Sequence, residues 1–156
     1  MFEHVVVKTN KINFILSPSP TQHNILEYSK MLKKQNVKYV VNLCGTNYDT
    51  SILDEIGVSY RPIHYPDGSI PTDFIIKEWK QICDKSISEY KNIAVHCISG
   101  LGRAPTLICF YLVYYEDWTS HGSIEHIRKL RKGSINSIQL NYILNIKKKK
   151  NCCVIS

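Results

Sequence analysis

Several features are scarce or missing in this 156-residue sequence, and their absence excludes whole classes of protein. No apolar run approaches the roughly 18 residues that a membrane-spanning helix needs. The longest run, from Leu107 to Tyr115, suits a buried helix. The first residues lack a basic stretch followed by an apolar core, so we expect no secretion signal. The six cysteines follow neither a disulfide framework nor the paired spacing of a zinc site, which suits a reducing compartment.

Acidic residues are missing from the last part of the chain. From His126 to Ser156 there are eight Lys or Arg residues and no Asp or Glu, within a formal net charge of +7. Such a basic segment binds either nucleic acid or an anionic membrane. No aromatic residues are interleaved with Lys147–Lys150 and no nucleic-acid-binding motif accompanies them, so we expect no nucleic-acid partner.

What is present predicts one globular domain, since 44% of the residues are hydrophobic and charges are interspersed among them. The expected strands are 5–8, 11–16, 37–43, 58–63 and 93–96, with the first two paired as an antiparallel hairpin; the expected helices are 21–35, 49–56, 73–90, 104–114, 120–132 and 137–146. Their alternation predicts an α/β fold with a central, mainly parallel sheet flanked by helices on both faces. The domain is expected over residues 1–146, followed by a polybasic tail over 147–156.

The most informative stretch joins the last expected strand to the helix at 104–114. It is His96-Cys97-Ile98-Ser99-Gly100-Leu101-Gly102-Arg103. A strand, a glycine loop and a helix start direct backbone N–H groups to one point, where the helix dipole favours an anion. The same setting favours a thiolate at Cys97, and the Arg103 guanidinium matches two oxygens of a phosphate. A nucleophilic cysteine in a phosphate cradle is the chemistry of a cysteine-dependent phosphatase.

This stretch resembles the His-Cys-x-x-Gly-x-x-Arg signature of the protein tyrosine phosphatase superfamily. Its Gly-Leu-Gly-Arg-Ala-Pro continuation looks like the phosphatase of regenerating liver (PRL) subfamily, and the resemblance extends over nearly the whole chain. It implies a dual-specificity phosphatase-like fold, no cofactor or metal, and hydrolysis of phosphate monoesters through a phosphocysteine on Cys97. The phosphate would be bound by Ile98, Ser99, Gly100, Leu101, Gly102 and Arg103. A rhodanese-type sulfur carrier uses a similar cysteine loop, but the rest of the chain favours the phosphatase.

The leaving oxygen needs a proton, and Asp67 is the candidate general acid. It lies in a loop that follows an expected strand and precedes the nucleophile, as the acid does in the family, although Ile63-His64 replaces the usual Trp-Pro at the loop's start. The alternative is an ordinary turn aspartate. His96 is interpreted either as a hydrogen-bonding support for the loop or as a core residue.

Four further interpretations concern the expected surroundings of Cys97. Cys44 ends another expected strand; it is either a core cysteine or, as the PRL resemblance implies, the partner of Cys97 in a reversible disulfide. Ala104 replaces the Ser or Thr that many relatives carry, which predicts slow hydrolysis of the phosphocysteine. Gln139 resembles a residue found late in dual-specificity phosphatases but also suits helix packing. Arg128, Arg131 and Lys132 either widen the positive field or form a solvated helix face.

The C-terminus, Cys153-Val154-Ile155-Ser156, is a C-a-a-X box whose terminal serine favours farnesylation of Cys153, with methylation of the processed end. Lys147–Lys150 supply the second, electrostatic signal that stable anchoring requires. We therefore expect the cytoplasmic face of the plasma membrane and endomembranes, and an anionic membrane as a partner.

Substrate and partners follow from the resemblance. A shallow site is expected, so a phosphorylated protein and a phosphoinositide both stay open as substrates. The rival hypothesis is a binding module that regulates a CNNM-type magnesium transporter through its active-site face. The resemblance also implies a homotrimer.

Overall fold

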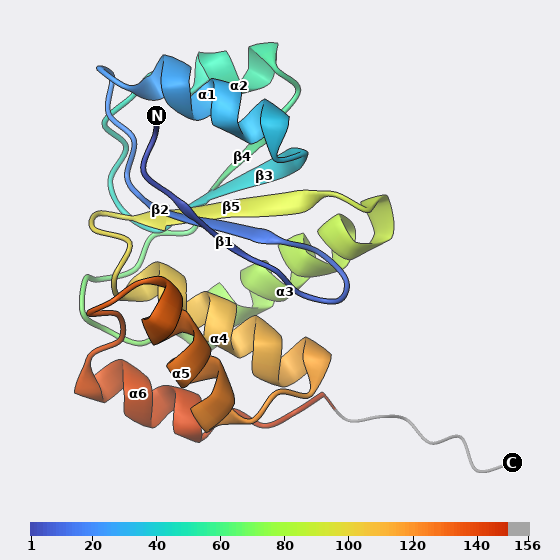
Figure 1. The fold of residues 1–156 in the computed structure, drawn as a ribbon, viewed down its shortest axis with the longest axis vertical. Coiled ribbons are helices and arrows are strands. Elements are labelled where there is room, and N and C mark those ends of the chain that lie inside the picture. Colours follow the sequence, from blue (N-terminus) through green and yellow to red (C-terminus); the bar gives the residue numbers. More distant parts are fainter. Residues whose placement is uncertain (150–156) are drawn as a thin grey trace, which may run out of the picture.

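The computed structural model describes residues 1–149 and shows a five-stranded sheet between two layers of helices (Figure 1). The strands are β1 (Val5–Val7), β2 (Phe14–Pro18), β3 (Val37–Asn42), β4 (Ser59–Pro62) and β5 (Asn92–Cys97). The helices are α1 (Ile25–Lys34), α2 (Ser51–Glu55), α3 (Asp73–Glu89), α4 (Arg103–Glu116), α5 (Ser120–Leu130) and α6 (Ser137–Leu144). The predicted prenylation box, with Cys153, and Lys150 lie outside the described residues.

The strand order is β1-β2-β5-β3-β4. β1 pairs antiparallel with β2, as the hairpin prediction required, and every other pair is parallel. β5 therefore lies in the middle of the sheet, where helices cover both of its faces, and its residues from Ile93 to Cys97 are all buried. The predicted α/β fold with a mainly parallel sheet is confirmed.

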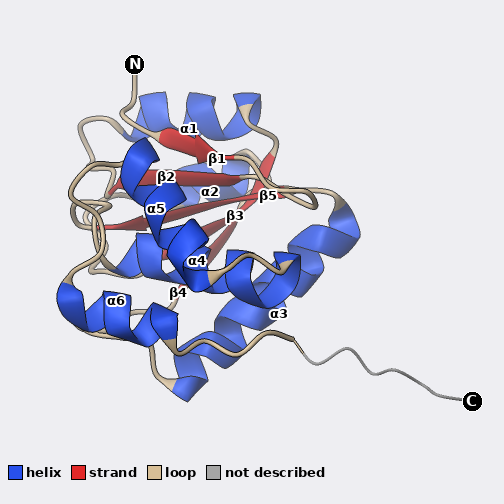
Figure 2. Cartoon of the chain, turned by 60° about the horizontal axis from the view of Figure 1, so that its bottom comes forward, coloured by secondary structure: helices blue, strands red, loops and turns tan. Residues whose placement is uncertain are grey.

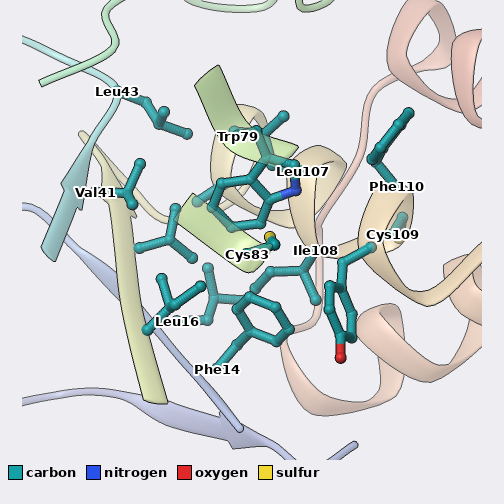
Figure 3. Packing of buried hydrophobic residues seen from close by; sticks show 14 of the residues in the cluster. Phe14, Leu16, Val41, Leu43, Trp79, Cys83, Leu107, Ile108, Cys109 and Phe110 are labelled. Carbon is teal, nitrogen blue, oxygen red and sulfur yellow. The ribbon is translucent and has the colours of Figure 1, made fainter. Parts of the chain in front are cut away.

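The two faces of the sheet carry separate cores. α1 and α2 cover one face, and α3 to α6 cover the other (Figures 1 and 2). The larger core lies on the side of α3 to α6, and Trp79 of α3 is fully buried there, with its ring centroid 5.7 Å from that of Phe14 (Figure 3). Burial of large apolar side chains is the main source of stability in such a core. Within residues 1–149 no helix is both long and apolar enough to cross a membrane.

Some predicted boundaries were wrong, because polar contacts hold residues at the ends of the expected elements in turns. β2 begins at Phe14 rather than at residue 11, since the Glu116 carboxylate accepts hydrogen bonds from the backbone N–H groups of Asn10 and Lys11 and holds them in a turn. α1 begins at Ile25, because the Thr21 N–H donates to the Asn24 side chain (2.7 Å) and closes a turn before the helix. The Thr21–Asn24 contact is local, and such contacts compete with regular structure at element ends; the contact of Glu116 with Asn10 joins residues far apart in the sequence.

Gly100, in the loop between β5 and α4, packs against β2. Its φ is +73°, and a Cβ there would lie 2.8 Å from the carbonyl carbon and oxygen of Ser17. Gly57 has nearly the same φ, +74°, with nothing within 4 Å of a Cβ. An alanine at Gly57 would meet only backbone strain, whereas an alanine at Gly100 would meet the same strain and a steric overlap with Ser17. Comparing the two substitutions therefore separates the two effects.

We expect Gly57→Ala to lower the free energy of unfolding by about 1 to 2 kcal/mol, the usual cost of a left-handed conformation for an alanine. Gly100→Ala should cost clearly more, because the loop must also move away from Ser17. Urea unfolding of both variants and the parent protein measures the difference. Equal losses in the two variants would show that the contact with β2 is not tight.

Candidate active site

Cys97 is the last residue of β5, at the edge of the sheet where the parallel strands end. It pairs with Pro18 of β2, while its neighbour His96 pairs with Asn42 of β3. The Leu43 N–H donates to the His96 carbonyl (3.0 Å), which carries the chain from β3 alongside the end of β5. Cys44 and Cys97 thus share one edge, as predicted, and Cys97 is buried with 2% of its surface exposed.

The backbone carbonyls of the Cys97 loop, residues 97–103, turn away from its centre. Ile98 accepts a hydrogen bond from the Ser19 N–H (3.0 Å), Leu101 from the Ile135 N–H (2.7 Å) and Gly102 from the Thr106 N–H (3.1 Å). The carbonyls of Ser99 and Gly100 accept from Nη2 (2.6 Å) and Nε (3.1 Å) of Arg131. Five consecutive carbonyl groups are therefore held by partners outside the loop.

The amide groups of the same peptide units, those of residues 99–103, face the opposite way, because the N–H of a trans peptide points away from its carbonyl. Among the hydrogen bonds formed within residues 1–149, none is donated by the backbone N–H groups of residues 98–102. Gly100 is buried and Leu101 and Gly102 are half-buried, and N–H groups in such places rarely lack partners; here they precede the N-terminus of α4. Converging N–H groups at a helix start form an anion site. The predicted phosphate-binding residues are brought together around Cys97.

Arg103 is the first residue of α4 and is nearly buried. Its Nη1 donates to the carbonyls of Leu43 (3.0 Å) and Tyr65 (2.9 Å), which fixes the guanidinium plane. Its Nε and Nη2 are buried and have no hydrogen-bond partner among the described residues. Two adjacent donors on one guanidinium edge match two oxygens of a phosphate. This guanidinium edge, buried and without a hydrogen bond from the described residues, is the strongest single sign of an oxyanion site.

Asp67 lies in the loop between β4 and α3, residues 64–72, which we call the Asp67 loop. Its Oδ1 is 3.5 Å from Nη2 of Arg103, although 76% of the Asp67 side chain is exposed. An ion pair of this length with one exposed partner contributes little to stability. Its importance is that it shows where the Asp67 carboxylate lies. The structure places this carboxylate at the mouth of the Cys97 loop, where a general acid is needed.

The N-terminal end of α6 ties the Asp67 loop down. Asn136 caps α6, and its Nδ2 donates to the Gly68 carbonyl (3.0 Å). Gln139 completes the capping box, and its Nε2 donates to the Ser69 carbonyl (3.2 Å). A Cβ added to Gly102 would lie 3.0 Å from the same Nε2. Gln139, fully buried, therefore serves both packing and the contact between the two loops.

Sequence reasoning missed the role of the segment between α5 and α6. Arg131, interpreted as a source of field or a surface residue, instead uses its guanidinium to hold the loop carbonyls and to pair with Glu3 (2.7 Å). Ile135 has a φ of 70°, which is rare for a β-branched residue. The Leu101 carbonyl and Arg128 Nη2 (2.8 Å to the Ile135 carbonyl) hold it there. No local pattern in the sequence signals these long-range contacts.

His96 is fully buried behind the nucleophile. Its Nε2 lies 2.9 Å from the Tyr48 hydroxyl and its Nδ1 lies 4.0 Å from Sγ of Cys44. Burial lowers the pKa of His96 to about 3, and a hydrogen bond with the Cys97 backbone opposes the shift only in part. The ring is therefore neutral near pH 7. His96 is a core residue that also forms a hydrogen bond beside the Cys97 loop, so both interpretations made from the sequence apply.

Cys44 is also buried, next to the predicted nucleophile. Its Sγ donates to Oδ1 of Asn42 (3.3 Å). Burial raises the pKa of the Cys44 thiol, against the opposing effects of Ser19 and Arg103, while the charge of Cys97 raises it further. Both cysteines are free thiols in this structure. Cys44 is thus held as a neutral thiol within electrostatic range of Cys97.

A shallow hollow of about 220 Å³ opens beside the Cys97 loop. Asp67 and Gly68 line it on one side and Leu101 and Gln139 on the other. Its small size suits a phosphate group and the start of its substituent. Within residues 1–149, no cluster of three His, Cys, Asp or Glu side chains has the arrangement of a metal site.

The buried neutral His96 predicts an acid-dependent loss of stability. Its pKa is about 3 in the folded protein and about 6.5 in an unfolded chain, so its stabilising effect is complete above pH 6.5 and is lost as the pH falls towards 3. We expect the free energy of unfolding to fall more steeply below pH 6.5 in the parent protein than in His96→Gln, which does not titrate. Urea unfolding at pH 7, 6, 5 and 4 provides the comparison, and parallel pH curves would contradict it.

Comparisons with known proteins agree with this geometry. The family profile described as the catalytic domain of dual specificity phosphatase matches residues 21–151. Protein tyrosine phosphatase PRL-1 of Trypanosoma cruzi is 33% identical over 136 residues, covering 86% of this chain and 77% of that protein. Human protein tyrosine phosphatase type IVA 3 is 32% identical over 145 residues, covering 89% and 81%.

A solved structure of a protein tyrosine phosphatase from Leishmania major superposes with a TM-score of 0.85 at 27% identity, covering 94% of this chain and 99% of that one. The named relatives and the catalytic-domain match bear out the predicted activity class as well as the fold. The chain belongs to the dual-specificity phosphatase family and, within it, to the PRL subfamily of protein tyrosine phosphatases.

Proposed function

We propose that this protein tyrosine phosphatase hydrolyses phosphate monoesters through a phosphocysteine on Cys97, with Asp67 as general acid and Arg103 as phosphate clamp. The observation that carries the proposal is the guanidinium edge of Arg103 formed by Nε and Nη2, which have no hydrogen-bond partner among the described residues. Nη2 has only the ion pair with Asp67, at 3.5 Å. That edge lies at the start of α4, in the loop whose amides of residues 98–102 are likewise free within the described chain. A bound phosphate satisfies all of these donors at once.

The mechanism has two displacements at phosphorus. In the first, the Cys97 thiolate attacks in line, the phosphorus–oxygen bond to the substrate breaks, and Asp67 protonates the leaving oxygen. The loop amides and Arg103 stabilise the equatorial oxygens as their charge grows. In the second, water loses a proton to Asp67 and attacks the phosphocysteine, which releases inorganic phosphate and the Cys97 thiolate.

The second displacement is expected to be slow. Ala104 follows Arg103 and is fully buried, so no hydroxyl is available there to assist departure of the thiolate. The next hydroxyl on α4 belongs to Thr106, and it already donates to the Gly102 carbonyl (2.8 Å). The phosphocysteine therefore accumulates. Such a loaded state would also suit the binding-module role predicted from the sequence, with a CNNM-type transporter as partner, and that role stays a prediction.

Rapid-mixing kinetics with a phosphotyrosine peptide test the enzymatic proposal. We expect a burst close to one equivalent of dephosphorylated peptide, followed by slow turnover, and neither phase in Cys97→Ser. Asp67→Asn should slow the burst by about 10² to 10⁴, the usual contribution of a general acid. Asp73→Asn is the matched control, because Asp73 is an exposed aspartate that begins α3.

Each result bears on a separate residue. A burst of normal rate in Asp67→Asn would remove Asp67 from its proposed role. Turnover without a burst would show that the step after phosphocysteine formation is not slow, against the argument from Ala104. Activity that survives in Cys97→Ser would overturn the mechanism as a whole.

We also propose that Cys44 and Cys97 form a reversible disulfide. A peroxide would oxidise the Cys97 thiolate to a sulfenic acid, and the Cys44 thiol would then displace water from it to give the disulfide. Support comes from the sheet edge that the two cysteines share and from the charge of Cys97, which contributes to the raised pKa of the Cys44 thiol.

Mild peroxide followed by peptide mapping should find a Cys44–Cys97 link that dithiothreitol removes. In Cys44→Ser the same treatment should drive Cys97 to the sulfinic and sulfonic acids and make inactivation irreversible. Cys83→Ser provides the control, since Cys83 is fully buried in α3. Reversible inactivation of Cys44→Ser to the same extent as the parent protein would contradict the proposal.

Membrane attachment is the remaining proposal. The sequence supports it through the C-a-a-X box at Cys153 and the basic residues before it. Lys147, Lys148 and Lys149 line a hollow of about 540 Å³ together with Lys80 of α3, although Lys148 is paired with Asp117 (2.7 Å). These cations would reinforce a single prenyl group at an anionic cytoplasmic membrane face.

A further inference from the structure

Apolar side chains are exposed beside the catalytic site, on the Asp67 loop and on α6. Ile138 of α6 is 62% exposed and Ile70 of the Asp67 loop is 41% exposed. They line one hollow of about 500 Å³, which we call the α6 groove. Its lining comprises Ile70, Ser137, Ile138, Leu140, Asn141 and Tyr142, with Asn145 at its end. An apolar patch of this kind, edged by polar groups, is typical of a binding surface.

The α6 groove and the hollow beside the Cys97 loop are built from the same two segments of the chain. Asp67 and Gly68 line the hollow while Ile70 lines the groove, and on α6 Gln139 lines the hollow while Ile138 lines the groove. Ser69, whose carbonyl accepts a hydrogen bond from Gln139, directly precedes Ile70. Ile138 directly precedes Gln139, which lies against Gly102 of the Cys97 loop. Both apolar residues are thus one position along the chain from groups that contact the catalytic loops. The α6 groove therefore borders the hollow in which the phosphate site lies.

The chemistry of the α6 groove selects among the possible substrates. None of its lining residues is Lys, Arg, Asp or Glu, whereas an inositol phosphate or an anionic membrane requires cations. The lysines gather instead in the neighbouring hollow that shares Tyr142 and Asn145. Isoleucine, leucine and tyrosine contacts suit an apolar side chain, while Ser137 and Asn141 offer partners for a peptide backbone.

We infer that the α6 groove binds an apolar side chain close in sequence to the phosphorylated residue of a protein substrate. The inference rests on the proposed function, because it presumes a phosphorylated residue in the Cys97 loop. It makes Ile70 and Ile138 specificity-determining residues and sets a phosphoprotein, rather than a phosphoinositide, as the substrate class.

Binding to the full-length Cys97→Ser protein tests the inference without requiring turnover. Calorimetry would compare phosphotyrosine peptides in which a single leucine is moved through the four positions on either side of the phosphotyrosine, the others being alanine. We expect leucine at one or two positions to tighten binding by about tenfold. Adding Ile70→Ser and Ile138→Ser should remove that gain and leave the affinity for phenyl phosphate, which has no flanking residues, unchanged.

Leu26→Ser is the matched control. Leu26 is 64% exposed, close to the value for Ile138, and lies on α1, which covers the opposite face of the sheet (Figure 1). This variant should keep the full preference for leucine. A preference that persists in Ile70→Ser/Ile138→Ser, or the lack of any preference in the parent background, would overturn the inference.

Two further binding measurements, with lipid vesicles and with a phosphoinositide headgroup, distinguish the alternative ligands of the groove. If the two substitutions weaken binding to phosphatidylcholine vesicles and leave peptide affinity unchanged, the groove is a membrane contact and the inference is wrong. Tighter binding of a phosphoinositide headgroup than of the best peptide would also overturn it. If phenyl phosphate binds but is not hydrolysed by the parent protein, the proposed function fails, while the leucine preference still decides the inference.

Discussion

The active site depends on the direction in which the backbone of the Cys97 loop is held. Five successive carbonyls are bonded outwards, to Ser19, Arg131, Ile135 and Thr106, so the amides face inwards. In a protein a peptide group that turns its oxygen one way presents its N–H the other way, and here the fold has fixed that choice before any phosphate arrives. Preorganised donors cost no rearrangement at the moment of reaction, which is why they stabilise a transition state effectively.

A single segment, from Arg131 to Gln139, connects the parts of the site. It holds carbonyls of the Cys97 loop through Arg131 and Ile135, and carbonyls of the Asp67 loop through Asn136 and Gln139. The uncommon left-handed conformation of Ile135 shows that this connection overrides local preference. The Cys97 loop and the Asp67 loop are therefore held by one segment, which also begins the helix that lines the proposed substrate groove.

Burial shifts the pKa values of two neighbouring side chains, His96 and Cys44, in opposite directions. It lowers the pKa of His96 to about 3, so the residue before the nucleophile cannot act as an acid near neutral pH. It raises the pKa of Cys44, so the second cysteine is held as a thiol. The raised pKa of Cys44 and the lowered pKa of His96 therefore hold both groups uncharged near neutral pH.

The sequence by itself determined the fold class, the strand–loop–helix unit around Cys97 and the sheet edge that Cys44 and Cys97 share, because apolar periodicity and the spacing of Cys97, Gly100 and Arg103 are local properties. It placed element ends less well, since contacts such as Glu116 with Asn10 are made between distant residues. Only the tertiary structure decided that Arg131 holds the loop carbonyls, that Gln139 joins the two catalytic loops and that His96 is neutral. Those roles depend on which distant segments pack together and on how much water they exclude, and neither is encoded in any short stretch of the chain.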